Sequence, residues 1–176
     1  YKKGNYATAL KEFKKAAQQG SPSAQYNLGN MYNNGEGVPQ NYVQAKSWWE
    51  KGAEQGEVFA QMNLGNMYYI GKGVPQDYAQ TVLWYTKAAQ KGNSKAQFNL
   101  ATMYDEGKGV PQNHKIAYIL FNLAASKGYS DAVINRDVAL KMLTPAARED
   151  AQRISTRLYN SKDFAADLRN LLNGQQ

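Results

Sequence analysis

The chain has 176 residues, of which 43% are hydrophobic, and a formal net charge of +7. Its mean hydropathy is −0.68, and it contains no apolar run near the ~18 residues that a membrane span needs, so no integral membrane segment is predicted. There is no cysteine, which excludes a disulfide framework and a cysteine-based metal site. The lysines are scattered among Glu and Asp. A nucleic-acid site would cluster basic residues with stacking aromatics, so none is predicted.

A nine-residue pattern recurs along the chain with a period of 36 residues. It begins at Ala24 as AQYNLGNMY and returns at Ala60 and at Ala96. A fixed period of roughly 20 to 50 residues is typical of a solenoid, in which each unit buries its apolar face by stacking on its neighbours. We therefore expect an array of stacked units.

The apolar spacing within each unit predicts two helices and no strand. In the first complete unit, Ala24, Leu28 and Tyr32 line one side of the first helix, and Ala45 and Trp49 line one side of the second. Glycines that tolerate a left-handed conformation are expected to end the helices. The first helices are expected to end at Gly35 and its equivalents, and the units to be joined at Gly20, Gly56, Gly92 and Gly128.

The starts of the second helices also carry a local signal. Asn41 and Asp77 are each followed three residues later by a glutamine, Gln44 and Gln80. This pairing is typical of a capping box and predicts a helix start at both positions.

The run Gly35-Glu36-Gly37-Val38-Pro39-Gln40, together with Ala24, Leu28, Tyr32 and Ala45, resembles the Sel-one-like repeat family, a relative of the tetratricopeptide repeats. The resemblance covers Asn5 to about Gly128. It implies an all-α fold, a right-handed superhelical solenoid of helix-turn-helix repeats, organised as one domain with C-terminal capping helices. The predicted segments are the second helix of a truncated repeat at 1–20, repeats at 21–56, 57–92 and 93–128, the first helix of a degenerate repeat at 129–143, and capping helices at 144–176.

The degenerate repeat is expected to end the array. Arg136 stands where earlier repeats have a leucine, so the outer side of this helix is predicted to be polar. A polar cap also accounts for the position of all five arginines in the tail, although contact with an acidic partner or a lipid surface is an alternative. These arginines are Arg136, Arg148, Arg153, Arg157 and Arg169.

Two helices are predicted in the tail. Thr144-Pro145 starts the first, and Ser161 starts the second, which ends near Gly174. The second carries an apolar stripe of Phe164, Leu168, Leu171 and Leu172. We expect this stripe to seal the last repeat near Ala132. The alternative is that it folds into the groove as an internal ligand.

The sequence does not predict an enzyme, a cofactor or a metal site. The one histidine, His114, occupies the repeat position of Tyr6, Tyr42 and Tyr78, and no partner for it is evident, so a structural role is expected. The loop glycines lack the Lys-Ser or Lys-Thr that a phosphate cradle needs, and no metal-ligand spacing occurs. Trp48 and Trp49 are expected in the core rather than in a ligand cage.

The side of each first helix that points away from the predicted core is the most informative surface. It keeps an apolar residue beside an asparagine in each repeat, although Asn is a poorer helix former than Ala by about 0.6 kcal/mol. The resemblance implies that this side lines a concave groove, where amides bind the backbone of a ligand and apolar groups take its side chains. The alternative is that the amides tie adjacent repeats together or are covered by the tail. The amide row is Asn27, Asn63, Asn99 and Asn135, flanked by Tyr26, Met62, Phe98 and Ile134.

The predicted protein-binding residues are Tyr26, Asn27, Asn30, Met62, Asn63, Asn66, Tyr69, Ile70, Phe98, Asn99, Thr102, Asp105 and Glu106. The first two repeats offer no Lys or Arg among these positions, which argues against a clamp for a terminal carboxylate. Asp105 and Glu106 at one end favour a segment with apolar anchors and one basic residue.

These observations predict a non-enzymatic protein-protein interaction module or scaffold of the bacterial envelope, a monomer on its own, that binds a peptide or protein segment. An immunity protein that neutralises a secreted toxin is an alternative. A second, from another class, is an envelope glycan or β-lactam hydrolase, which the lack of cysteines and of a nucleophile with a base disfavours. Similar bacterial chains often carry a signal peptide before such a half-repeat, so a periplasmic or secreted location is expected, with a cytoplasmic one left open.

Overall fold

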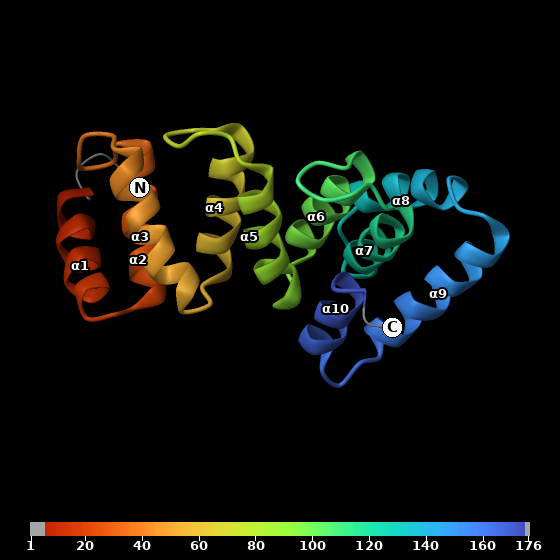
Figure 1. Cartoon of the computed structure of the whole chain (residues 1–176). Coiled ribbons are helices and arrows are strands. Elements are labelled where there is room, and N and C mark those ends of the chain that lie inside the picture. Colours follow the sequence, from red (N-terminus) through yellow and green to blue (C-terminus); the bar gives the residue numbers. More distant parts are fainter. Residues whose placement is uncertain (1–5, 175–176) are drawn as a thin grey trace. The chain divides into compact units, whose positions relative to one another are not determined.

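The computed structural model describes residues 6–174, which form ten helices and no strand (Figure 1). The predicted all-α solenoid of helical repeats is confirmed. Residues 1–5 and 175–176, which belong to the predicted truncated repeat and to the tail, lie outside the described residues. The chain divides into two compact units between Asp77 and Tyr78, here called unit 1 and unit 2.

Unit 1 contains four helices, and unit 2 contains six. Those of unit 1 are α1 (Tyr6–Gln18), α2 (Pro22–Asn34), α3 (Tyr42–Glu54) and α4 (Val58–Ile70). Those of unit 2 are α5 (Tyr78–Gln90), α6 (Ser94–Glu106), α7 (His114–Ser126), α8 (Asp131–Lys141), α9 (Pro145–Tyr159) and α10 (Phe164–Leu172). The first helices of the repeats are α2, α4, α6 and α8, and the second helices are α1, α3, α5 and α7.

The predicted helix start at Asn41 and the predicted helix end at Gly35 are confirmed. The Asn41 side chain accepts a hydrogen bond from the Gln44 backbone N–H at 3.0 Å and caps α3. Gly35 ends α2 with a φ of 73°, a left-handed conformation that a residue with a Cβ adopts only at a cost. Helix α2 therefore ends, and helix α3 begins, where the local chemistry predicts.

The core follows the repeat register. Leu28, Leu64 and Leu100 are completely buried at equivalent positions, as the solenoid pattern predicts. In unit 1, a Cβ at Gly29 would lie 2.3 Å from Cδ1 of the buried Trp49. The missing side chain at Gly29 thus makes room for the indole ring, and Trp49 is a core residue as expected.

Three buried glutamines form a second repeated feature, which the sequence did not reveal. Gln25 donates to the Ala17 carbonyl at 3.2 Å, Gln61 to Ala53 at 3.0 Å, and Gln97 to Ala89 at 3.4 Å. Each bond joins a first helix to the end of the preceding second helix. Each of these carbonyls also accepts a backbone hydrogen bond from the glycine of the following turn, Gly20, Gly56 or Gly92, so the glutamine side chain adds a second bond to the same acceptor and links the two helices.

The tail differs from its prediction. Helix α9 begins at Thr144-Pro145 as expected, but α10 begins at Phe164 and is capped by Asp163 rather than Ser161. Helix α9 packs on α7, and α10 packs mainly on α5 and α9 (Figure 1). The stripe of α10 therefore neither seals the array near Ala132 nor fills the groove, because the chain turns back after α8 and α10 packs on α5 and α9.

The exposed side of α8 mixes charged residues, among them Asp131, Asp137 and Lys141, with apolar residues that the predicted polar cap does not include. Ile134 is 71% exposed, Met142 is 62% exposed, and Val138 is half exposed between them. Because α9 folds onto α7 instead of continuing the array, no following helix covers these residues. Arg136 pairs with the adjacent Asp137 at 2.8 Å.

Candidate protein-binding groove

Two hollows lie along the first helices of unit 1. The α2 hollow has a volume of about 220 Å³, and the α4 hollow has a volume of about 190 Å³. The α2 hollow is lined by Tyr6, Ala9, Phe13, Asn27, Asn30, Met31, Asn34 and Glu36. The α4 hollow is lined by Asn33, Trp49, Asn63, Asn66, Met67, Ile70 and Lys72. Five predicted site residues therefore border these hollows: Asn27, Asn30, Asn63, Asn66 and Ile70.

An amide bond connects the two hollows. Oδ1 of Asn30 accepts from Nδ2 of Asn63 at 2.9 Å and from Nε1 of Trp49 at 3.1 Å. Asn63 of the amide row thus ties adjacent repeats together through its bond to Asn30. This is the role that the sequence analysis gave as the alternative to ligand binding. Each of the two amides still has a second polar atom, the Asn30 amino group and the Asn63 carbonyl oxygen, and neither makes a further hydrogen bond within residues 6–174. The pair can hold the helices in register and bind a ligand at once.

The apolar positions flanking the amides are used differently from repeat to repeat. The Tyr26 ring lies 5.8 Å from that of Phe59 and is half-buried. Met62 is only 5% exposed, so its predicted role as a surface anchor is wrong. An unbranched methionine side chain adapts to a gap between helices and is buried there, whereas the ring of Tyr26 stays half-buried.

In unit 2 the same side of the first helix is packed by aromatic rings. Phe98 lies 5.4 Å from Phe121 and 5.0 Å from Tyr129, measured between ring centroids. Thr102 donates to the Phe98 carbonyl at 3.2 Å, and Asn99 is half-buried beside them. The predicted residues of unit 2 lie together, but Phe98 is engaged in packing.

The acidic end of the predicted site is paired within the chain. Oδ1 of Asp105 lies 2.8 Å from Nδ1 of His114, and Glu106 lies 2.7 Å from the ammonium of Lys108. His114 therefore has a partner that the sequence did not show. These contacts weaken the attraction of Asp105 and Glu106 for a basic partner residue.

Three repeated glutamines brace the loops at the groove edge. Gln40 donates to the Asn33 carbonyl at 2.7 Å, Gln76 to Tyr69 at 2.8 Å, and Gln112 to Asp105 at 2.7 Å. Each bond holds the Gly-Val-Pro-Gln loop against the last turn of its first helix. The half-buried Tyr69 is thus fixed at the end of α4.

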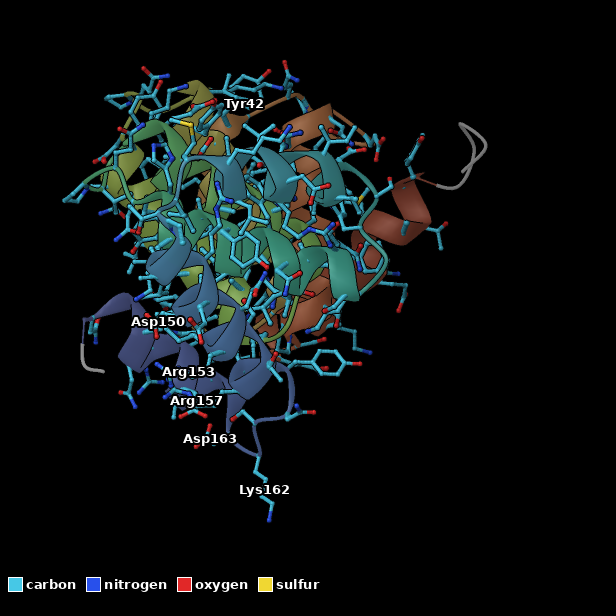
Figure 2. All side chains as sticks on the ribbon, turned by 90° about the vertical axis from the view of Figure 1, so that its right-hand side faces the viewer. Tyr42, Asp150, Arg153, Arg157, Lys162 and Asp163 are labelled. Carbon is cyan, nitrogen blue, oxygen red and sulfur yellow. The ribbon has the colours of Figure 1, made fainter. Side chains whose placement is uncertain are left out.

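The arginine-rich tail forms ion pairs and helix caps. Asp150 on α9 pairs with both Lys115 and Arg153. Figure 2 labels Asp150 and Arg153. Hydrogen bonds from Lys115 and then from Arg153 hold the pKa of the Asp150 carboxyl below its usual value. Arg148 donates to the carbonyls of Leu140 and Leu143 at 2.9 and 3.0 Å and closes the end of α8.

Residues 6–174 contain neither a membrane-spanning helix nor a cluster of metal-binding side chains. None of their helices has the length and apolar character of a membrane-spanning segment. Nor do they contain a group of three or more His, Asp or Glu side chains that could hold a metal ion.

Comparison with solved structures finds other repeat proteins. A Sel1 repeat protein from Oxalobacter formigenes is 36% identical with a TM-score of 0.69, over 73% of this chain and 96% of that one. A protective antigen present in uropathogenic Escherichia coli strains, displaying an SLR fold, is 29% identical with a TM-score of 0.58, over 95% of this chain but 43% of its own. Cysteine rich protein B of Helicobacter pylori is 26% identical with a TM-score of 0.55, over 70% of this chain and 94% of its own.

A comparison with curated proteins finds no match. The family model described as Sel1 repeat matches at residues 2–21, 22–57, 58–93 and 94–129. Proteins with these repeats are generally protein-interaction scaffolds and mostly not enzymes. The four matches and the helical array together show that this chain belongs to the Sel1 repeat family.

Proposed function

We propose that this protein is a non-enzymatic binding module of the bacterial envelope that holds a peptide or an extended protein segment along its first helices. The observation that carries the proposal is the pair of adjacent hollows in unit 1, both bordered by asparagines at equivalent repeat positions. Amides at a fixed spacing suit the regularly spaced polar groups of a peptide backbone.

The walls of the hollows support the same function. Phe13 and Ile70 provide apolar surface, and the Asn30 amino group and the Asn63 carbonyl oxygen supply one donor and one acceptor. A ligand could thus use apolar contacts for affinity and the amides for orientation. Within residues 6–174, His114 is bonded to Asp105 and to no hydroxyl or other nucleophile, so catalysis has no comparable support.

The envelope location rests on relatives. One relative is a protective antigen of pathogenic Escherichia coli, a description that fits a protein accessible to the immune system. Fractionation of the native host with the full-length protein tests this: recovery with the periplasmic or secreted fraction is expected, and recovery with the cytoplasm alone would contradict it.

A matched pair of variants tests the groove. Ile70 is 66% exposed and borders the α4 hollow, whereas Val43 is 70% exposed on α3 and borders neither hollow. Ile70→Glu places a charge in the groove, and Val43→Glu makes the same change elsewhere. In quantitative pull-downs from envelope extract, a true groove partner should be retained by the wild type and Val43→Glu and lost by Ile70→Glu. Equal retention by all three would place binding elsewhere.

A further inference from the structure

We infer that the two hollows of unit 1 select a bound segment by a pair of opposite charges: Glu36 receives a basic side chain in the α2 hollow, and Lys72 receives an acidic one in the α4 hollow. The inference rests on the proposed function and adds the chemistry of the partner. It also predicts which order of charges along the segment is accepted.

The two hollows are copies of one site that differ in charge. Asn27 and Asn30 of the α2 hollow correspond to Asn63 and Asn66 of the α4 hollow. Phe13 and Met31 likewise correspond to Trp49 and Met67. At two further repeat positions the hollows differ, with Asn34 against Ile70 and Glu36 against Lys72. The similar walls suit similar backbone contacts, while the exchange of Glu for Lys reverses the charge that is attracted.

Both charges are held near the hollows without an opposite charge. Oε1 of the half-buried Glu36 accepts from the Asn34 amide at 3.3 Å, which positions the carboxylate. The ammonium of Lys72 lies 4.8 Å from the centroid of the Tyr42 ring. Neither group forms an ion pair within the described part of the chain. In unit 2, by contrast, Glu106 and Lys108 neutralise each other.

The spacing of the hollows sets the spacing of the charges. The bond from Asn63 to Asn30 shows that side chains of α2 and α4 touch, so the helices lie about one helix diameter, roughly 10–12 Å, apart. An extended segment advances at most about 3.3–3.6 Å per residue. The basic and acidic side chains should therefore stand about three or four positions apart, in a short segment that spans both hollows.

The test uses a phage-displayed library of random twelve-residue peptides, selected on the wild type and on the double variant Glu36→Lys/Lys72→Glu. On the wild type we expect enrichment of peptides with one basic and one acidic residue at this spacing, in one order along the chain. On the double variant we expect the reverse order. A synthesised peptide that was selected on the wild-type protein should bind the double variant with an affinity about threefold to tenfold lower than its affinity for the wild type. This difference in affinity should shrink at high salt.

Two controls make the outcomes distinguishable. Lys51→Glu/Glu54→Lys exchanges one acid and one base on α3 outside both hollows and should leave the enriched order unchanged. Peptides that need the groove should fail to bind Ile70→Glu. Groove-dependent peptides with the same charge order on both proteins, or with no order, would overturn the charge inference and leave the proposed function standing. If no peptide depends on Ile70, both fail.

Discussion

Unit 1 and unit 2 use the same 36-residue repeat but present their first helices differently. In unit 1, Asn30 bonds to Trp49 and Asn63, and hollows stay open on either side of this amide pair. In unit 2, Phe98 packs against Phe121 and Tyr129, and the acidic residues have partners within the chain. The repeat thus fixes where the helices lie, whereas the residue at a few equivalent positions decides whether their surface keeps open hollows or is packed by aromatic rings.

The contact between Gly29 and Trp49 shows how the residue at one repeat position affects the hydrogen bonds of its neighbours. Gly29 of unit 1 faces the indole of Trp49, and the equivalent residues of unit 2 are Ala101 and the smaller ring of Phe121. The larger ring carries the N–H that bonds to Asn30. A glycine inside α2 therefore makes possible the hydrogen bond that orients a groove amide.

The largest expected effect is the loss of stability when the buried leucine that both units share is truncated. Leu64 and Leu100 are both completely buried, so Leu64→Ala and Leu100→Ala should each cost about 2–5 kcal/mol in free energy of unfolding. Denaturant melts followed by circular dichroism measure the loss. The exposed Val43→Ala is the control and should stay within about 0.5 kcal/mol. A similarly small loss for either leucine would contradict the shared repeat register.

A second prediction concerns the glycine that distinguishes unit 1. Gly29→Ala should destabilise by about 1–3 kcal/mol despite the better helix propensity of alanine, because the new methyl group meets the Trp49 ring. Adding Trp49→Phe reproduces the pair found in unit 2. Thermal melts should then show part of the stability restored. If the double variant is less stable than the sum of the two single losses, the ring does not cause the clash.

A smaller effect separates the amides of the two units. Asn63 donates to Asn30, so Asn63→Ala should cost about 0.5–1.5 kcal/mol. The Asn99 side chain makes no hydrogen bond within residues 6–174, so Asn99→Ala should be neutral or slightly stabilising. Parallel urea titrations measure both. Equal losses would mean that the amides play one role throughout the array.

The smallest effect concerns a helix cap and its pH dependence. Glu57 caps α4 through the Ala60 N–H, whereas Ser21 and Asn93 cap the equivalent helices. Burial raises the pKa of the Glu57 carboxyl above its ordinary value of 4.5. The folded state thus binds this proton more tightly than the unfolded state, and the stability gained at low pH is lost as pH rises through the raised pKa.

Replacing Glu57 tests the direction in which its contribution to stability changes with pH. Glu57→Asn should melt at a higher temperature than the wild type at neutral pH, and the advantage should shrink below the ordinary pKa, where both states of the wild type carry a neutral carboxyl. Melting curves between acidic and neutral pH measure the difference. An advantage that grows as the pH falls would contradict the raised pKa.

Much of the fold could be predicted because its signals are local and repeated. Gly35, Asn41 and Leu28 act through their own turn or their own helix, and the period fixes their equivalents. The tail could not be predicted in the same way. The stripe on α10 shows that Leu168 needs a cover, but amphipathic spacing does not say which helix supplies it.

The candidate site was predictable in outline and not in its bonding. Helical spacing placed Asn30 and Asn63 on one side of their helices, where they border the hollows. The bond between them joins residues 33 positions apart, which no local pattern encodes. Glu36 and Lys72 were missed as site residues because they lie in loops, beyond the helical spacing used to trace the surface.

The buried bonds of Gln25, Gln61 and Gln97 bear on how the length of such an array can change over evolution. Each joins a first helix to the carbonyl eight positions upstream, at the same point of every junction. Duplication or loss of one complete repeat would give each glutamine an equivalent carbonyl from its new neighbour. Gain or loss of a partial repeat would leave a buried amide without its acceptor, a cost that confines length changes to whole repeats.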